Sequence, residues 1–292
     1  MNKLAIVIPY YKIDFFEETL KSVAAQSNRN FTLYIGNDAS PDDPKQIIDQ
    51  YFDESSHHYF NYNNNLGGKN LALQWERILE NVKEDWFQIL GDDDMLSENF
   101  VDEFYDSLDT LDRENINVLK FPIKIIDAKN QFIKQFSFSK SIINRKDFLI
   151  SRIDHVSLSS LSENIFRTET YRKHKINQFP LAWHSDDCMI FDYAENDRIL
   201  YSEKSYIFIR NSGLNISSLS NNSKEKSQAT NAFYGYIISR YYHLFTSEQK
   251  KILLNCLKKH YYYTGKKATS NIIFTVSRDN IINGIRLIKY LF

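Results

Sequence analysis

The chain has 292 residues, which is enough for one large domain or for one domain with an appendage. Hydrophobic residues make up 42% and charged residues 25%, while glycine and proline number only 8 and 5, so a low-complexity or linker-rich protein is excluded. The two cysteines have no metal-ligand spacing and are typical of a reducing compartment. No apolar run reaches the roughly 18 residues of a membrane span, and we expect no secretory leader.

The net charge of −1 is unevenly distributed along the chain. Residues 221–292 contain 12 Lys and Arg against 3 Asp and Glu, a balance of +9, which leaves 24 against 34, or −10, in the first 220 residues. A basic tail beside an acidic body predicts an electrostatic partner such as anionic lipid or a charged glycan. A solvated helical face is the equally weighted alternative.

Strands and helices alternate through the first part of the chain. Short apolar runs rich in β-branched and aromatic residues predict strands, and apolar residues at helical spacing predict the helices between them. The predicted strands cover residues 4–9, 31–35, 59–62 and 86–90, and the predicted helices lie around residues 15–24, 47–52 and 71–82. This alternation predicts βαβ units, and therefore an α/β fold with a mostly parallel sheet flanked by helices.

Further along, the pattern is less regular. We expect a helix over 100–111 capped by Ser97, a hairpin of residues 117–126 and 131–138, a helix over 186–194 and a strand over 200–210.

A stretch rich in Asn, Ser and Gly, residues 211–223, predicts a mobile loop or linker. Beyond it we expect helices over 227–245, 247–260 and 279–291, the second opened by a capping box of Thr246 and Gln249. The predicted organisation is therefore a catalytic domain over 1–220 and a helical, basic, aromatic-rich region over 221–292.

Polar groups follow three of the predicted strands, at Pro9-Tyr10-Tyr11, at Asn37-Asp38-Ala39-Ser40 and at Asp92-Asp93-Asp94. The carboxyl ends of parallel strands share one edge of a sheet, where ligands bind in open α/β folds. Three adjacent carboxylates repel one another unless a cation or hydrogen-bond donors offset them, and Mg²⁺ or Mn²⁺ prefers such oxygen ligands together with substrate phosphates. Taken alone, the triplet would more simply be a solvated acidic loop that caps a helix, and the strand before it shifts the balance toward a ligand site.

Lys69, beside Gly67-Gly68, is placed to approach phosphates as a point charge. The turn after the first strand lacks G-x-G-x-x-G, and the chain lacks a Walker lysine loop, so a dehydrogenase and a P-loop enzyme are disfavoured.

Five motifs in this order resemble family-2 glycosyltransferases of the GT-A fold. They are the run Ile6 to Tyr11, the segment Thr19 to Gln26, the turn Asn37 to Ser40, the segment Asn65 to Asn70 and the aspartate triplet, and together they span roughly residues 1–110. The resemblance implies a nucleotide-sugar donor, a divalent metal such as Mn²⁺ or Mg²⁺, and inversion at the anomeric carbon. The missing Q-x-x-R-W motif points to transfer of a single sugar and not to processive polymer synthesis.

The resemblance also implies roles for individual residues. Asp38 matches the aspartate that contacts the nucleotide base, Asp92 is assigned to the ribose and Asp94 to the metal. The D-x-D motif is most simply Asp92-x-Asp94, and Asp93 remains a rival ligand because Gly91 replaces the first acid of the frequent pattern Asp-x-Asp-Asp. Pro9, Tyr11 and Lys69 complete the expected donor site.

Inversion needs a general base that takes the proton of the acceptor hydroxyl. The family places this acid roughly 90–100 residues after the metal motif, as an acidic pair that opens a helix. Asp187 matches the base and Asp186 the preceding acid, and His184 and Trp183 are expected in the acceptor pocket. Without the upstream motifs, the pair would more simply be a helix cap. For Trp183, a position in the core is the equally weighted alternative. The family's later Arg and His are represented only by Arg210, since Asn211-Ser212 follows it.

The sequence therefore predicts a metal-dependent inverting glycosyltransferase. It would move one sugar from a nucleoside diphosphate sugar, most commonly a UDP-sugar, to a hydroxyl of a surface polysaccharide or lipid-linked glycan. The alternatives are a non-catalytic nucleotide-binding or scaffold protein on the same fold, and a nucleotidyltransferase, whose Gly-rich basic turn is missing here. We expect a cytoplasmic protein without nucleic-acid partners. For its tail, a peripheral contact at the inner face of the membrane, packing on the body and self-association all stay open.

Overall fold

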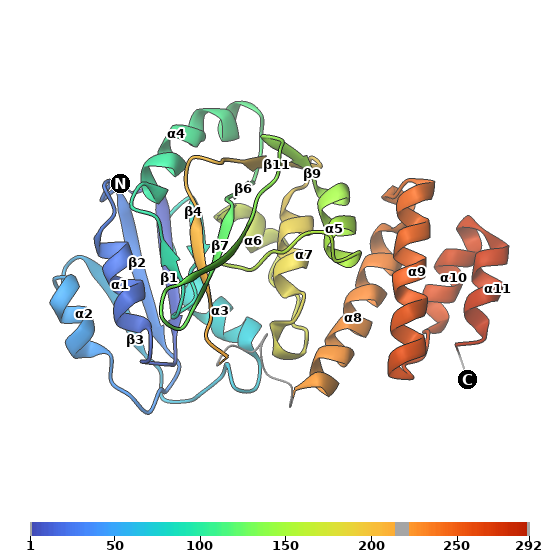
Figure 1. Ribbon diagram of the computed structural model, residues 1–292, viewed down its shortest axis with the longest axis horizontal. Coiled ribbons are helices and arrows are strands. Elements are labelled where there is room, and N and C mark those ends of the chain that lie inside the picture. Colours follow the sequence, from blue (N-terminus) through green and yellow to red (C-terminus); the bar gives the residue numbers. More distant parts are fainter. Residues whose placement is uncertain (1, 214–221, 291–292) are drawn as a thin grey trace.

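The computed structural model describes residues 2–213 and 222–290 (Figure 1). The α-helices, in chain order, are α1 (Phe16–Ala24), α2 (Lys45–Tyr51), α3 (Leu71–Leu79), α4 (Phe100–Arg113), α5 (Arg145–Ile153), α6 (Thr168–His174), α7 (Ser185–Tyr193), α8 (Ser223–Tyr241), α9 (Ser247–Thr264), α10 (Ser270–Asp279) and α11 (Ile281–Ile288). Two short 3₁₀ helices are η1 (Pro180–Ala182) and η2 (Tyr242–Leu244).

The strands form two sheets. The main sheet has eight strands in the spatial order β3-β2-β1-β4-β10-β6-β11-β9, and the smaller sheet has four in the order β5-β12-β7-β8. Their bounds are β1 (Leu4–Tyr10), β2 (Phe31–Asn37), β3 (His57–Asn61), β4 (Trp86–Ile89), β5 (Met95–Leu96), β6 (Val118–Lys120), β7 (Ile123–Asp127), β8 (Phe132–Phe136), β9 (Ile142–Asn144), β10 (Asn164–Arg167), β11 (Arg198–Tyr201) and β12 (Ile207–Asn211).

The main sheet is mostly parallel, as predicted. β1 runs parallel to β2 and β4, and β2 runs parallel to β3. Beyond β4 the antiparallel β10 separates it from β6, which again has the direction of β4 and is parallel to β11; the edge strand β9 is antiparallel. Apart from β9 and β10, the strands of this sheet therefore share one direction, and their carboxyl ends lie along one edge.

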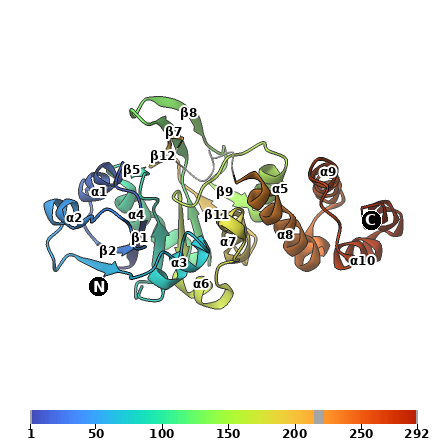
Figure 2. The same ribbon diagram turned by 90° about the horizontal axis from the view of Figure 1, so that it is seen from below.

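Helices cover both faces of the main sheet, because the apolar run of β1 alternates between two cores. Leu4, Ile6 and Ile8 point into the core that α1 and α4 cover, whereas Ala5 and Val7 point into the core that α3, α6 and α7 cover. A strand buried on both faces reads as a continuous apolar run, so the observed αβα layers account for the predicted central strand (Figures 1 and 2).

Two of the predicted strands are each divided in the structure. The segment 117–126 becomes β6 in the main sheet and β7 in the small sheet, because Pro122 lies between them and has no N–H to donate to a ladder. The segment 200–210 becomes β11 and β12, separated by the polar stretch 202–206. The predicted hairpin is confirmed as β7 and β8, which pair antiparallel.

The cap predicted at Ser97 is wrong. Helix α4 begins at Phe100 after Asn99, without a side-chain cap hydrogen bond. The Ser97 hydroxyl instead lies 2.6 Å from the Ser205 hydroxyl and accepts from the Tyr206 N–H, so it connects β5 to the segment before β12.

The four C-terminal helices build a core of their own against the body (Figure 1). Leu149 and Ile153 of α5 and Cys188 and Phe191 of α7 contribute to this core. The capping box of Thr246 and Gln249 is confirmed at the start of α9. Helix α10 was not predicted as a separate element, and the boundary predicted near residue 220, with most of the loop predicted over 211–223, falls outside the described residues. Among those described, no helix is both long and apolar enough to cross a membrane.

Candidate active site

The first element of the site is the junction of β1 with the segment after β4. Asp92 follows β4, and its Oδ2 accepts hydrogen bonds from the backbone N–H groups of Tyr11 and Lys12, both at 2.8 Å. The Asp38 N–H donates to the Tyr10 carbonyl at 3.0 Å, which brings the end of β2 to the same place. The structure thus joins all three strand ends that carry the predicted polar groups.

Asp38 is only 4% exposed and is held by protein donors. One carboxylate oxygen accepts from the Leu66 N–H at 2.7 Å and from the Arg77 guanidinium at 2.5 Å, and the other accepts from the Gly67 N–H at 2.8 Å. A Cβ at position 67 would lie 2.6 Å from Asp38 Oδ2, so a larger residue there would displace the carboxylate from its present position. Asp38 therefore positions the segment before α3, and the sequence analysis did not identify its partner Arg77.

The aspartate triplet concentrates negative charge. Burial, followed by the neighbouring Asp94 and Asp92 carboxylates, raises the pKa of Asp93 to about 8. Burial also raises the pKa of Asp94 to about 6, against the lowering effect of its hydrogen bond from Ser162. The pKa of Asp92 is raised too, mainly by burial. Protein groups therefore offset this charge only in part, and a cation would lower the cost of ionising all three acids.

Two carboxylates of the triplet lie close to Gly91. A Cβ at this position would lie 2.9 Å from Asp94 Oδ2 and 3.3 Å from Asp93 Oδ1, so both carboxylates approach the same glycine. No group of three or more His, Cys, Asp and Glu suitable for a metal occurs within residues 2–213 and 222–290. One or two carboxylates suit Mg²⁺ or Mn²⁺, which usually takes its other ligands from water and phosphate.

Two residues outside the triplet hold Asp94 in place. The Ser162 hydroxyl donates to Asp94 Oδ2 at 2.6 Å and accepts from the Gly91 N–H at 3.0 Å. The Arg210 N–H donates to Asp94 Oδ1 at 3.0 Å, and the buried Arg210 guanidinium donates to the Asp93 carbonyl and to Glu18. Sequence reasoning noticed Arg210 only through the family pattern and missed Ser162, for which the serine-rich run 157–162 is the available signal.

A buried ion pair braces the loop that carries Ser162. The Lys120 ammonium lies 2.6 Å from Glu163 Oε1, with 1% and 0% of the two side chains exposed. Glu163 also accepts from the Ser160 N–H and from the Ser159 hydroxyl. Such a pair is favourable only when its remaining hydrogen bonds are satisfied, as they are here, so it fixes the loop beside Asp94.

The predicted acidic pair opens α7. The Asp187 side chain is 2% exposed and accepts from Arg152 Nε at 2.8 Å, while His184 Nδ1 lies 2.9 Å from its other oxygen. Burial alone would raise the pKa of Asp187, but Arg152 and His184 together hold it well below its usual range. Asp186 is half-buried, and burial followed by the neighbouring Asp187 charge raises the pKa of Asp186 to about 7.

The remaining predicted residues lie around these groups. Pro9 is in β1 opposite Gly36 of β2, Tyr11 is 39% exposed, and Lys69 is exposed in the turn before α3. Trp183 is half-buried, with the Lys226 ammonium 5.0 Å from its ring. Trp183 and Lys226 thus connect the start of α7 to the C-terminal region.

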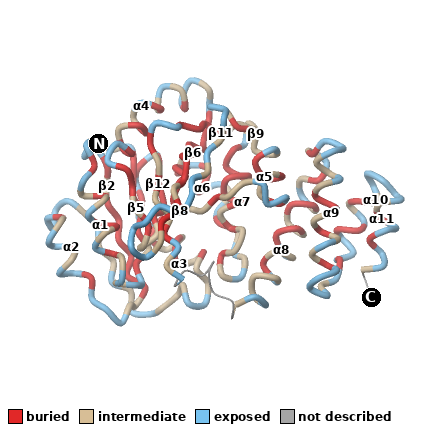
Figure 3. The backbone as a smooth tube through the Cα atoms, viewed as in Figure 1, coloured by how far each residue is buried: buried red, intermediate tan, exposed pale blue. Residues whose placement is uncertain are grey.

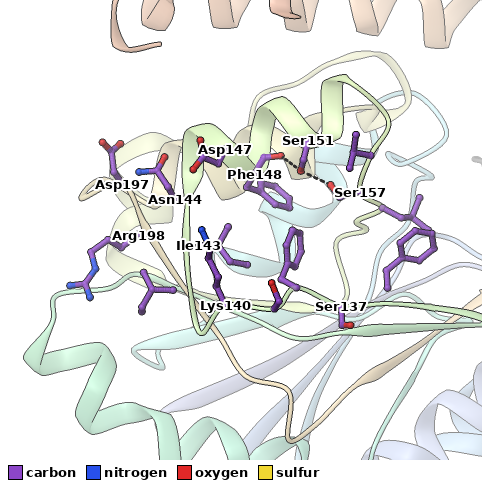
Figure 4. Close-up of a pocket in the computed structure, with 16 residues that line it drawn as sticks. Ser137, Lys140, Ile143, Asn144, Asp147, Phe148, Ser151, Ser157, Asp197 and Arg198 are labelled. Atoms are coloured by element: carbon purple, nitrogen blue, oxygen red, sulfur yellow. Dashed lines mark hydrogen bonds between the residues drawn. The ribbon is translucent and has the colours of Figure 1, made fainter. Parts of the chain in front are cut away.

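A separate cavity of about 540 Å³ lies beneath α5, between that helix and the segment from β8 to β9 (Figure 4). Aromatic and aliphatic side chains and several serines line it, and none of the predicted site residues is among them. The cavity is connected to the acidic pair through Arg152. The carbonyl of Ser157, which lines the cavity, accepts a hydrogen bond from the Arg152 guanidinium at 3.0 Å, and Arg152 also donates to Asp187.

Solved structures similar to this chain share its fold. The structure of residues 1–349 of Staphylococcus aureus TarS in complex with UDP-GlcNAc is 20% identical, with a TM-score of 0.67, and the match covers 98% of this chain and 79% of that one. For the same fragment in complex with UDP the identity is 19%, the TM-score 0.64 and the coverage 90% and 72%. These likenesses show an α/β GT-A fold.

Curated relatives match only over part of their own length. A teichoic acid poly(glycerol phosphate) polymerase of Staphylococcus epidermidis is 26% identical over 183 residues, which are 60% of this chain and 23% of that protein. An uncharacterised glycosyltransferase of Rickettsia typhi is 27% identical over 128 residues, or 44% of this chain and 38% of that protein. The match thus covers less than half the length of either relative.

The family comparison agrees with the geometry. Residues 5–172 match the family described as Glycosyl transferase family 2, a region that includes β1, the Asp38 turn, the aspartate triplet and Ser162. The acidic pair on α7 and the four C-terminal helices lie beyond the matched region. Since the match covers more than half of the chain, the protein belongs to glycosyl transferase family 2.

Proposed function

We propose that the protein is a divalent-metal-dependent, inverting glycosyltransferase. It transfers one sugar from a nucleoside diphosphate sugar, with UDP as the proposed nucleotide, to a hydroxyl of a surface polysaccharide or lipid-linked glycan. The observation that carries this proposal is the gathering of Asp92, Asp93 and Asp94 at the ends of β1 and β4 in a chain of this family. The UDP and UDP-GlcNAc complexes of TarS, a protein of the same fold, support the choice of donor.

For the donor, we propose that the nucleotide lies over the ends of β1 and β2, near Pro9, Tyr11 and Asp38. Leu66, Gly67 and Arg77 already donate hydrogen bonds to the Asp38 carboxylate. In this proposal Asp38 therefore contributes to binding of the nucleotide base mainly by holding the segment before α3 beside the end of β2. Asp92 orders the Tyr11-Lys12 backbone beside the ribose. Lys69, exposed in the turn before α3, supplies a positive charge to the phosphates.

For the metal, we propose Asp94 as the principal ligand. Asp92 is the second ligand of the simplest D-x-D motif, and like Asp94 it already accepts hydrogen bonds from protein groups. Asp93 approaches Gly91 together with Asp94, which favours Asp93 as the second ligand. A bound divalent cation would stabilise the negative charge that develops on the departing diphosphate.

For the base, we propose the acidic pair, with Asp187 as the proton acceptor that the family resemblance implies. Asp187 is ionised at neutral pH because of Arg152 and His184. One observation favours Asp186 instead, since this residue is less buried and its pKa of about 7 suits proton transfer near neutral pH. In either case the acceptor would lie near Trp183 and His184.

The proposal is tested with the full chain, UDP-GlcNAc as the donor probe and Mn²⁺. We expect calorimetry to detect UDP binding that requires the metal, and coupled detection of UDP to show slow hydrolysis of the donor without an acceptor. Binding of UDP without any turnover, across a panel of UDP-, GDP- and TDP-sugars with glycan acceptors, would favour the non-catalytic scaffold and overturn the enzyme proposal.

We further propose that the C-terminal region contacts the inner face of an anionic membrane. Ile281, Ile282, Ile285 and Ile288 of α11 are between 42% and 68% exposed, on the outermost helix of the molecule (Figure 3). This helix belongs to the region with a balance of +9, which would repel an identical face of a second copy but attract anionic headgroups.

Sedimentation with phosphatidylglycerol–phosphatidylcholine vesicles tests this contact. We expect the chain to sediment with these vesicles, the double variant Ile282→Ser/Ile285→Ser to remain in solution, and the matched control Val156→Ser, which removes an exposed valine of the body, to sediment normally. Equal behaviour of the wild type and the double variant, or self-association in light scattering that the double variant abolishes, would contradict the proposal.

A further inference from the structure

The start of α7 contacts the first C-terminal helix at a specific point. His184 Nε2 lies 3.1 Å from the Thr230 hydroxyl of α8, and the His184 ring stacks on the Phe233 ring with 4.4 Å between centroids and an interplanar angle of 14°. Thr230 and Phe233 are one turn apart on α8, so both reach the same imidazole. The contact joins the C-terminal region to His184, which lies two residues before the acidic pair.

The His184 imidazole bridges α8 and the candidate base, because its other nitrogen lies within hydrogen-bond distance of Asp187. His184 Nδ1 lies 2.9 Å from Asp187 Oδ2. With Nδ1 donating to the carboxylate, Nε2 can form a hydrogen bond with the Thr230 hydroxyl in either protonation state of the ring, because a hydroxyl both donates and accepts. His184 itself is in the left-handed backbone region, with φ of 71°, so the backbone at this position is costly and the two side-chain contacts help to hold it.

Helix α8 is firmly seated on α7. The Tyr236 and Tyr241 hydroxyls donate to the two oxygens of Asp192 at 2.8 and 2.9 Å. Phe233 is 1% exposed and belongs to the core that α8 shares with α5 and α7. Thr230 is therefore presented to His184 by a rigid helix.

We propose that Thr230 and Phe233 are positioning residues that hold His184 against Asp187, so that the C-terminal helices complete the catalytic acid pair. This inference rests on the proposed function. According to this inference, the C-terminal helices, which lie beyond the region of the family match, contribute to the transfer reaction of the α/β domain. This contribution does not depend on a membrane contact.

Several charged groups share this environment and enter the expected pH dependence. Arg152 of α5 contacts Asp187, and both Lys120 of β6 and Arg152 interact electrostatically with Asp186. Glu163 interacts with Arg152, and His184 with His260 of α9. Among these, His184 stabilises the charged forms of both Asp186 and Asp187. Displacing His184 therefore raises the proton affinity of the pair, whichever acid accepts the proton.

The experiment compares Thr230→Val, which keeps the shape and removes the hydroxyl, with Thr230→Ser, which keeps the hydroxyl. The readout is hydrolysis of UDP-GlcNAc with Mn²⁺ across pH. We expect Thr230→Val to lower kcat about 5- to 20-fold with unchanged KM for the donor, and to move the acidic limb of the pH profile upward by about half a unit. Thr230→Ser should retain wild-type values, and Phe233→Leu should behave as Thr230→Val.

Ser239→Ala is the matched control, because it removes a hydroxyl of α8 that binds Asn271 of α10 and is remote from His184. Thermal unfolding checks that each variant is folded. If Thr230→Val and Phe233→Leu are folded and keep the wild-type kcat and pH profile, or change only KM, the inference is overturned while the proposed function stands. A wild type that neither binds UDP nor turns over the donor overturns the proposed function, and the inference with it.

Discussion

Two groups of buried acids lie in this molecule, and they are compensated in different ways. In the triplet that follows β4, burial and mutual repulsion raise the pKa of Asp93 to about 8 and that of Asp94 to about 6. In the pair on α7, Arg152 and His184 hold the pKa of Asp187 below its usual range, and only Asp186 is raised, to about 7. Opposite charge supplied by the protein keeps an acid ionised, and where it is insufficient the acid binds a proton more readily.

This difference agrees with the roles proposed for the two groups. The triplet is the proposed site of a cation and a diphosphate, because an added positive charge would favour the ionised forms of its acids. The pair is the proposed site of proton transfer, because the charge of one acid changes the proton affinity of the other. Four variants would sharpen or break this distinction.

The largest effect is expected for Asp94→Ala. Removing the proposed principal ligand should reduce turnover of UDP-GlcNAc by about 10³-fold or more and abolish the Mn²⁺ dependence of UDP binding in calorimetry. Asp109→Ala, on the exposed face of α4, is the control and should change neither quantity. Metal-dependent UDP binding that survives in Asp94→Ala would remove Asp94 from the metal site.

Within the acidic pair, Asp187→Asn and Asp186→Asn should separate the base from its neighbour. The variant that lacks the base should bind UDP normally and lose transfer by roughly 10²- to 10⁴-fold, the usual contribution of general base catalysis. Rates of single turnover, measured beside UDP affinity, identify that residue. Wild-type rates in both variants would show that the base lies elsewhere.

Stability distinguishes the pair from the triplet as well. Arg152→Gln should lower the free energy of unfolding by about 3 kcal/mol, because it leaves the buried Asp187 charge with His184 alone. Denaturant unfolding followed by tryptophan fluorescence measures this loss. Arg113→Gln, which breaks an exposed pair with Asp109, should change stability little. Similar losses in both variants would contradict the role given to Arg152.

The smallest effect concerns Asp186 and pH. Its pKa is about 7 when folded and about 3.9 when unfolded, so from pH 4 to 7 the unfolded chain is ionised there and the folded one is not. This residue therefore lowers stability as pH rises through that window. Asp186→Asn should raise the free energy of unfolding at pH 8 by about 1–2 kcal/mol, seen as a higher melting temperature, and should leave both quantities unchanged at pH 4. An equal change at both values would contradict the raised pKa.

Much of the body could be predicted from local patterns. The apolar run from Leu4 to Pro9 predicted a strand that is buried on both faces, and the alternation up to residue 95 predicted the parallel sheet. The capping residues Thr246 and Gln249 predicted the start of α9. These signals are local, because periodicity, capping and turn chemistry act within a few residues of the chain. The division of residues 117–126 into β6 and β7 was missed, although Pro122 inside that run is a local signal for it.

The partners of the acids were not readable in this way. Each acid accepts hydrogen bonds from residues that are 35 to 116 positions away in the chain. The donors are Arg77 for Asp38, Ser162 and the Arg210 backbone for Asp94, and Arg152 for Asp187. No periodicity links residues that are so distant, and only the order of the strands in the sheet brings them together.

The amino-acid sequence by itself determined the strands, most of the helices, the order of the acidic motifs and the family they resemble, because each depends on neighbouring residues. Only the tertiary structure decided which acids have cations or hydrogen-bond donors beside them, and that α8 reaches His184. Charge compensation depends on distances through space and on burial, and these exist only when the chain has folded.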